Sequence, residues 1–336
     1  MLKRFFFFFI ISVLLLSSCN WTSDSWFNEH ESNTEEKIHR YDRIVDEFVS
    51  LNSYSALQRL NLEYPKPTRL LIEDVLGIGL VDDARIEQRL REYFMDSTMQ
   101  VLLEDVHRKY ADMKAEEREL YAVFHKIHAV DSTFSIPLIY TQISGLNQSI
   151  VVGDSLLGIS LDKYLGKDYP LYKKYYYDWQ YNKMDRSRIV PDALYYYISY
   201  EYPLPHDRVH TLLDYMVDYG KIHWVIAHCR GTSMTREMGF DEKRVAWYRS
   251  NEGYVWRWLL LNNALMSADR MMIKRFFQPR PNTLYLGSNS PDQIGLWLGM
   301  QIVSRYMENH PNKTMKDLLL TTDYRKILEE SGYSPR

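Results

Sequence analysis

The chain has few cysteines, no long apolar run beyond its first residues and no strong excess of either charge. Only Cys19 and Cys229 occur among 336 residues, so a fold held by several disulfides is excluded. The formal net charge of −3 argues against nucleic acid as a partner. A Gly-x-Ser-x-Gly elbow, a phosphate-binding glycine loop and a cysteine pair for metal are also missing. Stability must come from packing, for which 27 tyrosines and a 46% share of hydrophobic residues provide the material.

The beginning of the chain has the layout of a secretory signal that ends at a cysteine. A basic pair precedes an apolar run over residues 5–16, too short to span a bilayer, and small residues follow it up to Cys19. This layout resembles a bacterial lipoprotein signal, which implies removal of residues 1–18 and acylation of Cys19, for example with palmitate, as a membrane anchor. A cleaved signal with an incidental cysteine is the alternative. Asn20 is not the aspartate of an inner-membrane retention signal, so we expect an anchor in the outer membrane with the chain facing the periplasm. The sequence does not decide between the two leaflets of that membrane.

The rest of the chain divides into a tether and one domain. Residues 19–34 are polar and without periodicity, which is typical of a flexible tether. From residue 35 to residue 336 the apolar spacing predicts a single, mainly helical domain, interrupted by a small sheet at about 136–162. The predicted strands cover residues 136–143, 149–152 and 156–161, and Gly153-Asp154 is a turn that links antiparallel strands. The expected class is therefore α+β, mainly α-helical with one small antiparallel sheet.

A central helix is predicted at 290–309. Ser290-Pro-Asp-Gln293 has the pattern of a capping box with proline at the first helical position. The residues that follow leave almost no polar face, so this helix should be buried. Gly295 and Gly299 lie four apart, where another element can approach closely.

Two histidines offer a candidate metal site. His206 and His210 would lie one turn apart on a helix, a spacing at which two imidazoles share zinc in metallopeptidases. The glutamate that would activate water is replaced by Asp207. The alternative is that this polar side of the helix faces water, because apolar residues occupy another side.

Glu252 is the second candidate. In helical register it shares a face with Tyr248 and Trp256, and a carboxylate on such a face must find a cation or hydrogen-bond donors, or hold a proton. The candidate partners are Arg305, Lys221 and a histidine of 206–210, and Asn251 lies beside it in sequence. A buried structural ion pair and a functional acid are both open.

Taken together and in order, several motifs resemble the gliding-motility lipoprotein family GldB of Bacteroidetes. Besides the Cys19 anchor they are Ile136-Pro-Leu-Ile-Tyr-Thr-Gln-Ile-Ser-Gly145, Leu161-Asp-Lys-Tyr-Leu-Gly166, Gly220-Lys221, Trp247 with Asn251-Glu252 and Trp256, Ser267-Ala-Asp269, and the Ile294–Met307 segment. The resemblance implies a lipoprotein required for surface gliding in some relatives, with no established catalytic residues. Such proteins also occur in non-gliding species, so movement is not implied by the resemblance alone.

The order of helices, small sheet and further helices also looks like the layout of zincin metallopeptidases. Two histidines, His206 and His210, stand where zincins have theirs, and Glu252 fits the later ligand position. Because the activating glutamate is absent, we expect a zincin-like scaffold that has lost its metal, and an unrelated helical fold is the alternative.

Three functions follow as hypotheses. The first is a non-enzymatic lipoprotein without a cofactor, anchored to the membrane through Cys19, that binds other envelope proteins and no nucleic acid. The alternative is a zinc-dependent hydrolase or peptidase with His206, His210 and Glu252 as ligands. A third is a binder of a glycan fragment in an aromatic cleft around Trp247 and Trp256.

Overall fold

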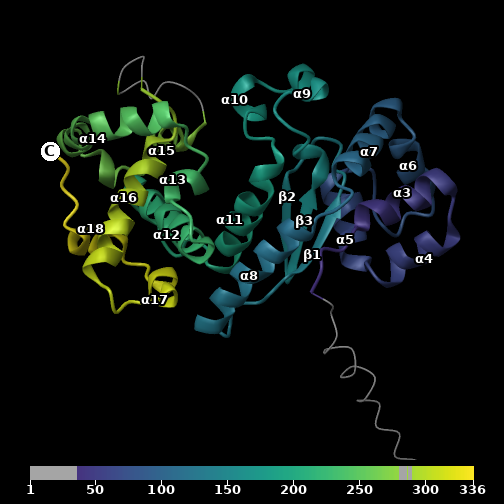
Figure 1. The fold of residues 1–336 in the computed structure, drawn as a ribbon, viewed down its shortest axis with the longest axis horizontal. Helices are drawn as coiled ribbons and strands as arrows, with labels where there is room; N and C mark the ends of the chain where they lie inside the picture. Colours follow the sequence, from purple (N-terminus) through teal and green to yellow (C-terminus); the bar gives the residue numbers. More distant parts are fainter. Residues whose placement is uncertain (1–35, 280–285, 287–289) are drawn as a thin grey trace, which may run out of the picture. The chain divides into compact units, whose positions relative to one another are not determined.

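The computed structural model describes residues 36–279, 286 and 290–336, and its elements carry the labels of Figure 1. The chain divides into two units, residues 1–37 and residues 38–336, and every element named below belongs to the second unit. Cys19, the predicted signal and the predicted tether lie outside the described residues. Within the described ranges, no helix is both long enough and apolar enough to cross a membrane.

The segment before the sheet is helical, as predicted, and it buries one face of each helix. In α3, for example, Ile44, Val45 and Phe48 are buried at helical spacing. Side chains that accept backbone N–H bonds fix two of the starts, Ser53 for α4 and Asp96 for α7. The elements are α3 (Tyr41–Leu51), α4 (Tyr54–Leu62), α5 (Pro65–Arg69), a π-helix (Leu70–Val75), α6 (Ile86–Phe94), α7 (Ser97–Lys109) and α8 (Lys114–Val130).

The sheet has three strands in the order β1-β3-β2, formed by β1 (Leu138–Gln142), β2 (Ile150–Gly153) and β3 (Leu156–Ser160). β2 and β3 form the predicted antiparallel hairpin. β1, however, runs parallel to β3, so the sheet is mixed and the prediction of an antiparallel sheet is wrong for this pair. The reason is that β3 is buried along its whole length and needs a hydrogen-bonded neighbour on each edge. The hairpin supplies β2 on one edge, and β1 occupies the other.

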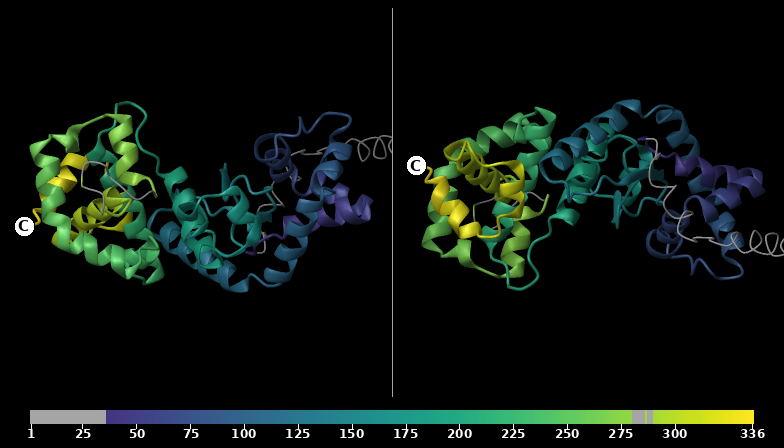
Figure 2. Two further views of the ribbon diagram at one scale, coloured as in Figure 1. Left: turned by 90° about the horizontal axis from the view of Figure 1, so that it is seen from above. Right: turned by 90° about the horizontal axis from the view of Figure 1, so that it is seen from below.

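Helices again make up most of the chain after the sheet. α11 packs on β2, β3, α8 and α12, and α12 packs in turn on α16 (Figure 1). The elements are α9 (Pro170–Tyr175), α10 (Asp178–Tyr181), α11 (Ile189–Glu201), α12 (Leu212–Arg230), α13 (Met234–Glu237), α14 (Glu242–Leu261), α15 (Arg270–Phe277), α16 (Ile294–Asn309), α17 (Met315–Leu320) and α18 (Tyr324–Ser331), with short 3-10 turns at Leu161–Lys163, Arg186–Arg188 and Ala264–Met266. Both views of Figure 2 show the green-to-yellow helices gathered together, apart from the purple helices that begin this unit.

α12 and α16 cross in close contact, and the crossing rests on glycines. A Cβ added at Gly299 would overlap the backbone carbonyl of Met216, and one at Gly220 would overlap the carbonyl of Gly299. The prediction that another element approaches α16 closely at its glycines is therefore confirmed. Backbone packs directly on backbone at this crossing, and the surrounding side chains of both helices are buried.

α16 ends at Asn309 as predicted, but it begins at Ile294, and the capping box predicted from Ser290 is wrong. Gln293 precedes the helix with φ +58°, in the left-handed region, and no side chain caps the helix start. Other contacts hold the residue before it: Asp292 pairs with Arg244 at 3.1 Å, and its carbonyl accepts a hydrogen bond from the Tyr248 hydroxyl. These long-range contacts hold Asp292 outside the helix, which begins two residues later.

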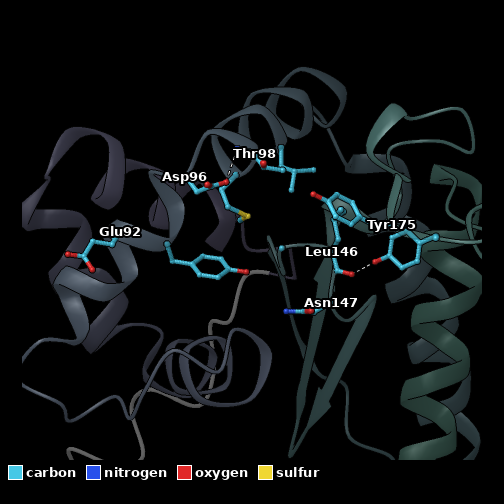
Figure 3. Close-up of a pocket in the computed structure, with 11 residues that line it drawn as sticks. Glu92, Asp96, Thr98, Leu146, Asn147 and Tyr175 are labelled. Atoms are coloured by element: carbon cyan, nitrogen blue, oxygen red, sulfur yellow. Dashed lines mark hydrogen bonds between the residues drawn. The ribbon is translucent and has the colours of Figure 1, made fainter. Parts of the chain in front are cut away.

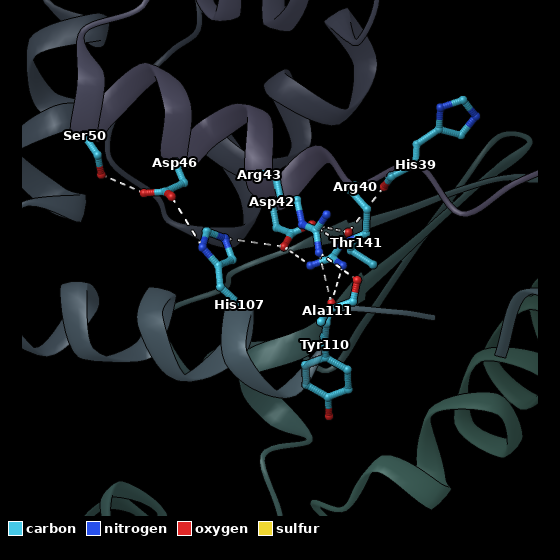
Figure 4. A network of polar contacts seen from close by, with 10 residues as sticks. All are labelled: His39, Arg40, Asp42, Arg43, Asp46, Ser50, His107, Tyr110, Ala111 and Thr141. Atoms are coloured by element: carbon cyan, nitrogen blue, oxygen red, sulfur yellow. Dashed lines mark hydrogen bonds and ion pairs between the residues drawn. The ribbon is translucent and has the colours of Figure 1, made fainter. Parts of the chain in front are cut away.

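The N-terminal end of the second unit is held by the polar network of Figure 4. His39 forms a parallel bridge with Tyr140, donating its N–H to the Ile139 carbonyl at 2.8 Å. The next residue, Arg40, donates two hydrogen bonds to the buried Asp42 carboxylate, at 2.9 and 2.7 Å. Asp42 also accepts a hydrogen bond from the Thr141 hydroxyl. The network thus attaches the entering chain and α3 to β1.

Candidate functional site

Glu252, on α14, is partly buried and lies between two aromatic side chains. Trp297 donates its indole N–H to one carboxylate oxygen at 3.0 Å, and Tyr333 donates its hydroxyl to the other at 2.6 Å. Burial, followed by this bond to Glu252, raises the pKa of Tyr333, so its hydroxyl stays a donor. Arg305 lies over the Tyr333 ring, 5.6 Å from the ring centre. The hydrogen-bond donors anticipated for Glu252 are thus two neutral aromatic groups.

Lys221, on α12, contacts other groups than Glu252. Its side chain is 3% exposed, and the ammonium donates to the Thr321 carbonyl at 2.8 Å. Asp218 lies 3.9 Å away, and the Tyr324 ring centre 5.0 Å away. Burial lowers the pKa of Lys221 to about 8, against the opposing pull of Asp218. These contacts fasten α12 to the segment between α17 and α18.

Asn251 has a local role within α14. Its side-chain amide donates to the Trp247 carbonyl, one turn earlier on the same helix, at 2.9 Å. The bond satisfies the amide without another element.

The histidines do not lie on a helix, and that part of the sequence prediction is wrong. α11 ends at Glu201 and α12 begins at Leu212, so His206 lies in the connection between them. Thr211 starts α12 through a capping box with Asp214, so the helix begins only after both histidines.

His210 is occupied by local contacts. One ring nitrogen lies 2.5 Å from the Pro205 carbonyl, and the other lies 3.6 Å from Asp214. Over the residues that the structure describes, no group of three or more His, Cys, Asp or Glu side chains is arranged to hold a metal ion. The zincin-like scaffold is not confirmed.

A cavity of about 830 Å³ opens beside the loop that follows β1 (Figure 3). One wall comes from α6 and the start of α7, the other from the loop Ser144–Asn147 and the end of α9. The lining residues are Glu92, Tyr93, Asp96, Thr98, Met99, Leu102, Gly145, Leu146, Asn147, Tyr175 and Tyr176. Glu92 and Asp96 are exposed, and no lysine, arginine or histidine is among these described lining residues. The cavity is acidic and aromatic.

The loop at the cavity edge is held by two neighbouring charged residues, Asp162 and Lys163, which the fold buries. Asp162 accepts the backbone N–H groups of Ser144 at 2.9 Å and of Leu146 at 2.6 Å. Lys163 donates to the Leu146 carbonyl at 3.0 Å and to the Tyr176 hydroxyl at 2.7 Å. Burial raises the pKa of Asp162 and lowers that of Lys163.

Leu146 is strained by this arrangement. Its φ is +66°, a left-handed conformation that costs a leucine free energy unless its surroundings impose it. Both its N–H and its carbonyl are fixed from outside the loop by the bonds just described. The fold therefore fixes the shape of the cavity edge.

The rest of the segment 161–166 joins three parts of the fold: α9, α11 and the end of α7. Tyr172 donates its hydroxyl to the Asp162 carbonyl at 2.5 Å and accepts the Leu165 N–H at 2.8 Å. The Tyr164 hydroxyl donates to Asp192 on α11 at 3.2 Å, and its carbonyl accepts from Tyr110. This segment positions the cavity edge.

Comparison with known protein families decides what the chain is related to. The model of the family described as gliding motility protein GldB matches residues 26–335. The chain belongs to the GldB family. Comparison with curated proteins and comparison with solved structures each return no match. The GldB segment that defines the cavity edge, Leu161–Gly166, is among the motifs that carry the sequence resemblance.

In this GldB-family chain, the sequence predicted no role for Asp162 and Lys163 beyond their place in the Leu161–Gly166 motif. A signal was available, because two adjacent charged residues follow a strongly apolar strand, where burial forces each charge to find partners. The acidic wall formed by Glu92 and Asp96 carried no such signal, since both are exposed helix-surface residues.

Proposed function

We propose that this GldB-family chain is a lipid-anchored, non-enzymatic envelope protein that holds a neighbouring envelope protein in its acidic cavity. Its place would be the outer membrane, facing the periplasm, with Cys19 as the anchor. The family match supports a lipoprotein with a role in gliding motility. The roughly fifteen-residue tether would reach on the order of 20 Å as a flexible coil, which favours a partner in the same envelope layer over a diffusing substrate.

The observation that carries the proposal is the fixed, acidic edge of the cavity. Asp162 and Lys163 are buried in order to hold Leu146 in a strained conformation beside the opening. Strain of this kind persists where the surroundings impose it and clusters at functional sites. The groups that seemed suited to chemistry, Glu252 and Lys221, are instead engaged in contacts between helices.

The occupant we propose is a segment of a partner protein that carries lysine or arginine. Glu92 and Asp96 form no ion pair within the described residues, so both carboxylates can meet a cation. Tyr93 and Tyr175 add aromatic surface of the kind enriched at protein interfaces. A cavity of about 830 Å³ has room for several side chains.

Site-specific photo-crosslinking in cells tests the proposal. A photoreactive residue in place of Thr98, which lines the cavity, should crosslink the same protein repeatedly, through a peptide that contains lysine or arginine. Glu92→Lys should lower the yield about tenfold, the loss expected from replacing one favourable charge contact by a repulsive one. Glu87→Lys, the same change on the exposed surface of α6 outside this cavity, is the matched control.

Crosslinking that survives Glu92→Lys unchanged, or that is absent altogether, would remove the proposed docking site. Cys19→Ala tests the anchor separately. It should release the protein from membranes and abolish the same crosslink, and unchanged cellular function in that variant would contradict membrane-proximal action.

A further inference from the structure

A second cavity, of about 270 Å³, lies where the start of α16 meets α11 and α12, and the proposed docking function makes no use of it. Its volume is close to the lower end of small-ligand pockets. Its lining combines basic groups, a buried histidine and four aromatic rings: Ser149, Lys183, Arg188, Asp192, Tyr195, Tyr196, Tyr219, His223, Met238, Phe277, Gln293 and Leu296.

Lys183 supplies a positive charge that forms no ion pair among the described residues, although Asp292 and Asp192 attract it from a distance. Its ammonium donates to the side-chain oxygen of Gln293 at 2.8 Å, a neutral acceptor. The one carboxylate in the lining, Asp192, is already bound by Arg188 at 2.7 Å. Burial lowers the pKa of Lys183 to about 8, and the two nearby arginines add to that effect. Below that pH the cavity therefore carries one excess positive charge, which an anionic ligand would balance.

His223, on α12, supplies an unused polar atom. The residue is 7% exposed, and its Nδ1 is buried without a hydrogen-bond partner among the described residues. Burial, then Arg188 and Lys183, lower the pKa of His223 to about 3, so the ring is neutral at physiological pH. A neutral imidazole offers one donor and one acceptor, which suits a hydroxyl group. A buried polar atom of this kind is costly unless something binds to it.

The start of α16 adds a third feature. This helix of 16 residues begins without a side-chain cap next to Gln293 and Leu296 of the lining, where the Leu296 N–H donates to the Gln293 carbonyl at 3.0 Å. A helix N-terminus favours negative charge. Gln293 itself has a left-handed backbone, with φ +58°, and its side-chain oxygen accepts the hydrogen bond from Lys183. The strained residue before α16 therefore also positions the basic group of the cavity.

Aromatic rings form the remaining walls. Tyr195 stacks on His223 with ring centres 4.9 Å apart, and Tyr195 and Tyr219 are stacked at 5.7 Å. Phe277 continues the stack at 4.9 Å from Tyr219. Aromatic side chains with a few polar groups among them suit a compact ring that carries hydroxyls.

We propose that this cavity binds an acidic sugar unit of the hexuronic acid type. Lys183 and the start of α16 would hold the carboxylate, His223 would pair with a ring hydroxyl, and the tyrosine rings would pack against the sugar.

Isothermal titration calorimetry on the mature chain tests this, with glucuronate as the probe and glucose as its uncharged counterpart. Glucuronate should bind at least about tenfold more tightly than glucose, because only glucuronate has a carboxylate for Lys183. Lys183→Gln should remove that preference, and His223→Gln should weaken glucuronate about tenfold. Lys167→Gln, at the neighbouring cavity that Lys183 also lines, should bind as the unchanged protein does.

Several results would overturn the proposal: no glucuronate binding at millimolar concentration, equal binding of glucose, or a preference that survives Lys183→Gln. Inorganic phosphate binding as tightly as glucuronate would limit the site to simple anions and refute the sugar. Unchanged circular dichroism of each variant identifies a loss of binding rather than of fold. The crosslinking at Thr98 does not depend on this cavity, so the two proposals fail independently.

Discussion

The α12–α16 crossing and the Ser144–Asn147 loop both involve segments shared with the GldB family, yet different forces hold them. At the crossing, Gly299 lets two helix backbones touch, and the contact depends on volume. At the loop, Asp162 and Lys163 bind backbone groups, and the contact depends on charge and hydrogen bonding. Substitutions that add atoms should therefore destabilise the crossing, and substitutions that remove a charge should destabilise the loop.

Gly299→Ala should have the largest effect. The added methyl would overlap the Met216 carbonyl, which is backbone and cannot rotate away. We expect a loss of at least about 3 kcal/mol in the free energy of unfolding, measured by chemical denaturation. Gly153→Ala, in the sheet region, would place its Cβ 3.7 Å from the nearest atom and should be nearly neutral. Equal effects of the two changes would refute the role of volume at the crossing.

Asp162→Asn should be the next most damaging change. It preserves volume but puts an amide where two backbone N–H groups now meet a carboxylate. Leaving one buried donor unmatched should lower stability by about 2 kcal/mol and free the loop. Faster amide hydrogen exchange at Ser144 and Leu146 would report the loosened loop directly. Asp154→Asn, in the exposed turn between β2 and β3, is the control, and a similar loss there would contradict the assignment.

His223→Gln tests how a buried histidine of α12, one of the two crossing helices, makes stability depend on pH. The folded-state pKa of His223 is lowered to about 3 from 6.5, so the unfolded chain binds a proton below pH 6.5 that the folded chain does not. Stability from this group is present above pH 6.5 and is lost as pH falls. Between about pH 7 and about pH 5 the unchanged protein should therefore lose about 2 kcal/mol more than His223→Gln, measured by urea denaturation. His228→Gln, at an exposed site on the same helix, is the control and should lose as much unfolding free energy over this pH range as the unchanged protein does.

Glu252→Gln should have the smallest effect. The amide oxygen can still accept from Tyr333 or Trp297, so one neutral hydrogen bond replaces a charge-assisted one. A loss of about 1 kcal/mol in unfolding free energy is expected. A loss as large as that of Asp162→Asn would show that charge matters equally in both regions. Glu242→Gln, exposed at the start of α14, should cost no more than a few tenths of a kcal/mol.

What could be predicted from the sequence was local. The β2–β3 hairpin follows from a turn dipeptide, the end of α16 at Asn309 from the loss of apolar spacing, and the close approach at Gly299 from the absence of a side chain. Each depends on residues near one another in the chain.

The remaining features depend on partners far apart in sequence. β1 pairs with β3 although β2 lies between them in the chain, and Gln293 delays α16 because Asp292 is held by residues of α14. The helix predicted across His206 and His210 is an exception with a local cause, because the capping box of Thr211 and Asp214 starts α12 after both histidines. Lys183 and His223 gave no signal, because a single polar residue in a helical pattern does not reveal what the fold places opposite it.

The network at His39–Asp42 also has a mechanical consequence. An anchor at Cys19, as proposed, would pull on the protein through its N-terminal chain, which enters the fold through a parallel bridge to β1 and through the Arg40–Asp42 ion pair. Two backbone hydrogen bonds, at 2.8 and 2.9 Å, join His39 to Ile139 and Thr141. Tension on the proposed anchor would therefore pass to the strand whose end carries the cavity loop before it reaches α3, so this load and the proposed binding would act on one strand.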